Sequence, residues 1–191
     1  MEASGTLLTS LLTGLGLAGA AGLNAYVPLL GVALLGRAHL ISLTGPLELL
    51  THPVTLGVLL GLLALEVVVD KVPGADHVND LAQTFVRPAA GAVLFLGGSG
   101  AAGQVPPLVL LIAGLVTAFG VHATKAAVRP AVNVATLGVG APIVSLVEDV
   151  LSAITTLVAV LVPVLVVLLL AGVLWVGLRF ARRRRGERTR A

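Results

Sequence analysis

FGVHATKAAVRPAVN, residues 119–133, places charged side chains in the middle of an apolar sequence. On a helix that turns 100° per residue, its polar residues fall within an arc of roughly 80°. These residues are His122, Lys125, Arg129 and Asn133. Because a lysine or arginine at the centre of a bilayer costs about 2.5 to 3.5 kcal/mol, this stripe must face protein or water. The stretch is therefore a candidate binding site, and Pro130 is expected to kink or break the helix beside it.

The composition indicates an integral membrane protein. Of 191 residues, 57% are hydrophobic and 11% are charged, and the mean hydropathy is +1.07. Seven of the 12 lysines and arginines lie in an Arg-rich tail at residues 179–191, which predicts a cytoplasmic flank. We therefore expect a multi-pass protein of the cell inner membrane with a cytoplasmic C-terminus.

Two further features of the composition exclude classes of partner and site. The Arg-rich tail has no aromatic residue beyond Phe180 on which bases would stack, so we expect no nucleic-acid partner. The chain has no cysteine, which excludes disulfides and thiolate metal sites.

The apolar stretches predict an all-α integral membrane protein with about five transmembrane helices. No charged residue occurs between residues 3 and 36, a length too great for one span and too small for two spans with a loop. Pro28 would free the carbonyl of Asn24, which favours a broken or re-entrant helix there. One long tilted helix is the alternative. We expect a single transmembrane domain at residues 1–178.

A short internal repeat relates the two ends of this domain. A shift of 98 residues superimposes Asn24 on His122. The repeat halves that it suggests are residues 5–72 and 105–178. The unmatched segment between these halves is residues 76–98. If this segment crosses the membrane, the two halves, each with a broken segment, form an inverted repeat of the kind found in transporters. A shift of 42 residues, which matches the two Arg-Pro dipeptides, is a competing alignment.

Four motifs follow one another along the chain: GLNAYVP at residues 22–28, EVVVDKVP at 66–73, DHVND at 76–80, and HATK with a following RP at 122–130. As a set they make the chain resemble a bacterial membrane family known as domain of unknown function 4126. The resemblance covers nearly the whole chain except the Arg-rich tail. It implies a multi-spanning bacterial inner-membrane protein and assigns no catalytic residue, so the functional interpretation depends on the residues themselves.

Glu66 and Asp70 lie one helical turn apart near the end of the span that begins at residue 53. Two carboxylates that share a site can bind a proton, because one of them resists ionisation. Ordinary ion pairing with Arg87, Lys125 or Arg129 is the alternative interpretation.

Asp76, His77 and Asp80 open the next segment, where His and Asp three residues apart on a helix can bind one metal ion. The alternative is structural, because an aspartate at a helix start caps the helix and favours its positive end. A third ligand from His122 or Glu66 would be needed for a metal site.

These features predict transport of a small solute or ion. Broken helices that gather carbonyl groups, helix ends and charges form the substrate sites of transporters. The basic residues suit an anionic group, and cation transport through the carboxylates is an alternative. The expected substrate-binding residues are Asn24, Arg87, His122, Lys125, Arg129 and Asn133, and the expected proton or ion coupling residues are Glu66, Asp70, Asp80 and His122.

Two other functions stay open, a non-catalytic membrane scaffold and an intramembrane lipid-modifying enzyme that uses Asp76, Asp80 and His122. The sequence contains no serine hydrolase, zinc protease or P-loop motif. We therefore expect no catalytic residue and no cofactor. The expected partners are the lipid bilayer, the solute or ion and further copies of the chain.

Overall fold

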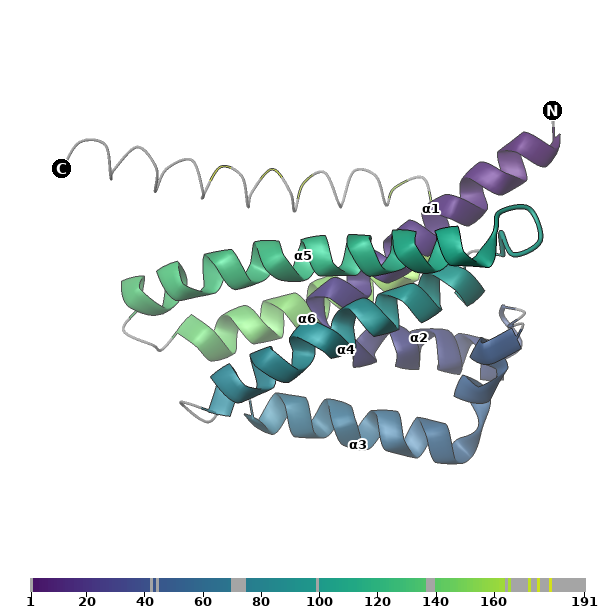
Figure 1. Cartoon of the computed structure of the whole chain (residues 1–191). Helices are drawn as coiled ribbons and strands as arrows, with labels where there is room; N and C mark the ends of the chain where they lie inside the picture. The colour runs from purple at the N-terminus through teal and green to yellow at the C-terminus, as the bar shows by residue number, and fades with distance from the viewer. Residues whose placement is uncertain are drawn as a thin grey trace.

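The computed structural model describes residues 2–41, 43, 45–69, 75–98, 100–136, 140–163, 165, 172, 175 and 179. Over these residues the chain is all-helical, as predicted. The elements are α1 Glu2–Leu23, α2 Tyr26–Arg37, the 3-10 helix η1 Gly45–Thr51, α3 Pro53–Val69, α4 Ala75–Gly98, α5 Pro107–Ala135 and α6 Gly140–Leu161 (Figure 1).

Helix α1 is the element that the others surround. It packs against α4, α5 and α6, and α4 and α5 also pack closely on each other. Helix α3 contacts α2, η1 and α4 and lies at the outer edge of the bundle, on the side opposite α5 (Figure 1). The N-terminal end of α1 extends beyond this bundle (Figure 1).

The break predicted near Asn24 is confirmed. Helix α1 ends at Leu23 and α2 begins at Tyr26, with Asn24 and Ala25 between them. The Asn24 Oδ1 atom accepts hydrogen bonds from the backbone nitrogens of Tyr26 at 2.8 Å and Val27 at 3.2 Å. The asparagine side chain therefore caps α2, whose first N–H groups have no partner within the helix. We call residues 24 and 25, with the two helix ends that they join, the α1–α2 junction.

The helix does not break at Pro130, where the sequence predicted a kink or a break. Helix α5 continues through Pro130, and α4 likewise continues through Pro88. A proline removes a single backbone hydrogen bond, so a long helix that is held on both sides can pass through it.

Among the described residues, two helices are long and apolar enough to cross a membrane, judged by length and composition alone. They are residues Pro107–Val128 of α5 and Pro142–Leu161 of α6. Shorter apolar helices occur at Leu7–Leu23, Tyr26–Arg37 and Pro53–Val69. These features are consistent with a membrane protein, and the count of five crossings stays a prediction.

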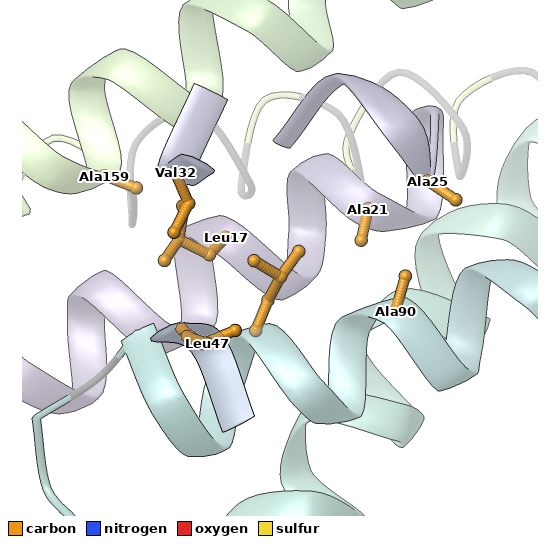
Figure 2. Close-up of a cluster of buried hydrophobic side chains, with 8 residues drawn as sticks. Leu17, Ala21, Ala25, Val32, Leu47, Ala90 and Ala159 are labelled. Atoms are coloured by element: carbon orange, nitrogen blue, oxygen red, sulfur yellow. The ribbon is translucent and has the colours of Figure 1, made fainter. Parts of the chain in front are cut away.

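A hydrophobic core lies beside the α1–α2 junction. Figure 2 shows side chains of α1, α2, η1, α4 and α6 meeting there, with Ala25 of the junction at one end. Leu17 and Ala21 belong to α1, Val32 to α2, Leu47 to η1, Ala90 to α4 and Ala159 to α6. The junction is thus held between an apolar core and the polar residues described below.

Helices α4 and α5 approach each other through glycines. A Cβ atom at Gly114 would collide with the carbonyl oxygen of Gly91 and lie 2.6 Å from the Phe95 Cβ atom. Gly120, two turns later on α5, has no neighbour within 4 Å of the same position. Only the first of these glycines is required by the packing of the two helices.

We predict that Gly114→Ala destabilises the protein by about 1 to 3 kcal/mol, because the added methyl group forces the two backbones apart. Gly120→Ala is the matched control, since it gives the same gain in helix propensity without a collision. Thermal unfolding of the detergent-solubilised protein measures both changes. Equal midpoints for the two variants would contradict the close packing of α4 and α5.

Candidate functional site

Asn24 joins the α1–α2 junction to two other helices. Its side chain is almost completely buried, with 1% of the residue exposed. While Oδ1 caps α2, Nδ2 donates to Glu66 Oε2 of α3 at 2.6 Å and to Asp149 Oδ1 of α6 at 2.8 Å. The hydrogen bonds to Oδ1 fix the orientation of the amide, so both Nδ2 protons point to carboxylates. One side chain therefore connects a helix break to two acidic residues.

Glu66 also binds Arg87, which extends the site to α4. Arg87 Nη2 lies 2.9 Å from Glu66 Oε1, and the side chains are 1% and 3% exposed. A second nitrogen of the guanidinium group, Nε, donates a hydrogen bond to Gln83 Oε1 at 3.4 Å. Gln83 Nε2 in turn donates to the Tyr26 hydroxyl oxygen at 3.4 Å. The chain of hydrogen bonds thus returns to the first residue of α2.

His122 on α5 completes the surroundings of Arg87. Arg87 Nη1 lies 3.4 Å from His122 Nδ1, and His122 Nε2 lies 3.2 Å from Thr84 Oγ1. A guanidinium group has only donors, so Nδ1 must be the acceptor. We therefore assign His122 as a neutral imidazole that carries its proton on Nε2 and donates it to Thr84.

Lys125 and Ser152 bind the end of α1. Lys125 Nζ forms an ion pair with Glu148 Oε2 at 2.7 Å and donates to the carbonyl oxygen of Leu23 at 3.1 Å. Ser152 Oγ is 2.9 Å from the carbonyl oxygen of Ala20 and 3.4 Å from that of Asn24. The last carbonyl groups of a helix lack donors from a following turn, and here Lys125 of α5 donates to that of Leu23. Ser152 of α6 adds a second donor to the carbonyl of Ala20, which also accepts from the backbone nitrogen of Asn24. A cation near the helix C-terminus is also favourable electrostatically.

The structure brings together five of the residues predicted from the sequence, which are Asn24, Glu66, Arg87, His122 and Lys125. The hydrogen bonds given above link helices α1 to α6 of the described part of the chain. We call these five residues, together with Gln83, Thr84, Glu148, Asp149 and Ser152, the polar network.

Several other predicted site residues cannot be placed in this network. Asp70 lies outside the described residues, and so do the side chains of Asp76, His77, Asp80, Arg129 and Asn133. Within the part of the chain that is described, no group of three or more His, Asp or Glu side chains could hold a metal ion. The proposed roles of these six residues stay predictions.

The sequence interpretation did not select Asp149, Glu148, Ser152, Gln83 or Thr84 as site residues. The sequence did mark Glu148 and Asp149, because they are the only charged residues between Arg129 and Arg179. Gln83 and Thr84 share a helix face with Arg87. Ser152 has no such signal, since serine is common in membrane helices.

The ion pairs of the polar network limit how an anionic ligand could bind. Arg87 and Lys125 each contact a carboxylate, so an anionic ligand would have to take the place of Glu66 or Glu148. The alternative of a lipid-modifying enzyme named Asp76, Asp80 and His122, and of these the structure describes only the side chain of His122, so that function stays a prediction.

Comparison with known protein families shows to which family the chain belongs. The family model described as "Domain of unknown function (DUF4126)" matches residues 11–183. The chain belongs to this family. The matched range of the DUF4126 protein includes every residue of the polar network, and the resemblance expected from the four motifs is confirmed. No curated protein and no solved structure matches the chain.

We predict that Asn24→Asp destabilises the DUF4126 protein at neutral pH by about 3 kcal/mol or more, because it places a third carboxylate against Glu66 and Asp149. The variant keeps the Oδ1 cap of α2. Its deficit relative to the parent should shrink as the pH falls, since protonation of one carboxyl group removes the repulsion.

Asn24→Ala is the control, because it loses the cap and both donors without adding a charge. Thermal midpoints of the two variants and the parent, measured from pH 8 to pH 5, test this prediction. A deficit of Asn24→Asp that is small at neutral pH, or that grows in acid, would contradict the placement of both carboxylates on Nδ2.

Proposed function

We propose that this DUF4126 protein is a membrane transport protein, either a secondary transporter or channel-like, for a small solute or ion. The ligand site in this proposal is the α1–α2 junction with the polar network. The observation that supports it is an interrupted helix on which charged side chains of four other helices converge. These are Glu66 of α3, Arg87 of α4, Lys125 of α5 and Asp149 of α6.

An interrupted helix and buried charges both cost free energy at membrane depth. Non-helical backbone at membrane depth is tolerated only where protein or a wet cavity satisfies it, and ionisable groups there are expensive. Transporters use half-helix ends and buried charges to hold substrates and coupling ions. A chain that places both features at one point has the components that such a site requires.

The topology is part of the proposal. It consists of about five crossings of the cell inner membrane, a cytoplasmic C-terminus, and an inverted repeat of residues 5–72 and 105–178. Support for the repeat comes from Asn24 and His122, which correspond under the shift of 98 residues and which both belong to the polar network. Helix α5 is continuous where the first half is broken. The lipid bilayer and further copies of the chain stay the expected partners.

The polar network allows two kinds of ligand. An anionic solute would replace Glu66 on Arg87 or Glu148 on Lys125. A cation or proton would bind carboxylate oxygens of Glu66 and Asp149, which already meet at one amide. The second kind of ligand leaves both ion pairs in place, which favours it over the first.

A membrane scaffold is the second candidate function. The observation that favours it is that Arg87 and Lys125 form buried ion pairs within the protein itself. A purely structural network needs no ligand to complete it, so a flux measurement separates the two functions.

We predict that vesicles containing the parent protein take up at least one member of a panel of small anions, monovalent cations and protons faster than empty vesicles. Lys125→Ala should abolish this flux, because it removes the cation that holds the end of α1. Thr124→Ala, one residue earlier and outside the polar network, should retain it. If no member of the panel enters above the rate of empty vesicles, the scaffold is the better account.

A further inference from the structure

A buried histidine faces a buried arginine in the polar network. His122 Nδ1 lies 3.4 Å from Arg87 Nη1, and the two residues are 4% and 1% exposed. The guanidinium group stays charged at every physiological pH, whereas histidine is the side chain that gains a charge just below neutral pH. The contact therefore exists in one protonation state of His122, the neutral one.

A second proton on His122 would have to bind Nδ1, since Nε2 already carries one. This proton would remove the acceptor of the Arg87 hydrogen bond and place two cations side by side, with little water to screen them. The Nε2 bond to Thr84 would persist, because it needs only a donor. Protonation thus acts specifically on the contact between α4 and α5.

Other charged groups surround this contact. Glu66 of α3 binds the far side of Arg87, and Lys125 of α5, three residues after His122, is paired with Glu148 of α6. Asp149 of α6 reaches the same region through Asn24. None of these contacts replaces the acceptor that Arg87 loses, so Arg87 must move toward Glu66 when His122 is charged.

We infer that His122 is a proton switch for the α1–α2 junction. Neutral His122 holds Arg87 in place, and Arg87 fixes Glu66, which holds the amide of Asn24. Protonated His122 releases Arg87, and the displacement passes through Glu66 to Asn24 and loosens the cap of α2. The ligand of the switch is a proton, and its role in transport rests on the function proposed above.

The switch is tested on the full chain by two measurements. Nitrogen-15 NMR of histidine-labelled protein reports the protonation of His122, whose signal is identified by its loss in His122→Gln. Hydrogen exchange at residues 20–28, corrected for the intrinsic effect of pH, reports the opening of the junction. Neither measurement requires a flux, so the switch can fail while transport is observed, and the reverse.

We expect the Nε2–H tautomer at neutral pH and a severalfold rise in exchange at residues 20–28 as His122 becomes protonated. His122→Gln keeps an acceptor for Arg87 and cannot be charged, so its exchange should stay low in acid. His122→Arg stays charged at every physiological pH and should exchange rapidly at neutral pH. If this charged variant does not fold, the exchange of His122→Gln and the NMR signal of His122 still test the proton switch.

Three results would overturn the inference. They are a doubly protonated His122 at neutral pH, exchange that does not change when His122 is protonated, and an acid response that persists in His122→Gln. His52→Gln is the control, because it removes an exposed histidine that lies outside the polar network. This variant should keep the acid response, and loss of the response would contradict the assignment to His122.

Discussion

The structure depends on one constraint, the interruption of a helix inside an apolar bundle. Helix α1 stops at Leu23, and its final carbonyl groups and the first N–H groups of α2 need partners that lipid and apolar side chains cannot supply. Asn24 supplies the acceptor for α2, and Lys125 and Ser152 supply donors for α1. The positions of α5 and α6 follow from this requirement, because each must present its donor at the junction.

The polar network also determines where α3 lies. Leu59 and Glu66 are the residues of this helix that are buried, and much of its remaining surface is exposed and apolar. Burying an ion pair is costly and rarely increases stability over an apolar pair. The bond between Glu66 and Arg87 joins this otherwise apolar helix to α4, beside its packing on α2 and η1. The same bond makes α3 responsive to any movement of Arg87.

The sequence predicted the broken helix because Pro28 and Asn24 lie in a stretch without charges. It predicted the convergence of Asn24, Glu66, Arg87, His122 and Lys125 because isolated charges in apolar sequence must meet inside a membrane protein. It named Arg87 as one of three possible partners of Glu66, without choosing among them, and it did not name Glu148 as the partner of Lys125. Pro130 suggested a kink or a break, and α5 does not break there, because local propensity at one residue is overridden by the helix on both sides.

The most direct test of this account is a double-mutant cycle on Glu66→Leu and Arg87→Leu, with thermal unfolding in detergent as the measurement. Each single substitution leaves one buried charge without its partner and should cost about 3 to 5 kcal/mol, whereas the double substitution removes both charges and should cost much less than the sum. This result is expected if the polar network fixes α3 to the α1–α2 junction. Additive losses in the double variant would contradict the account.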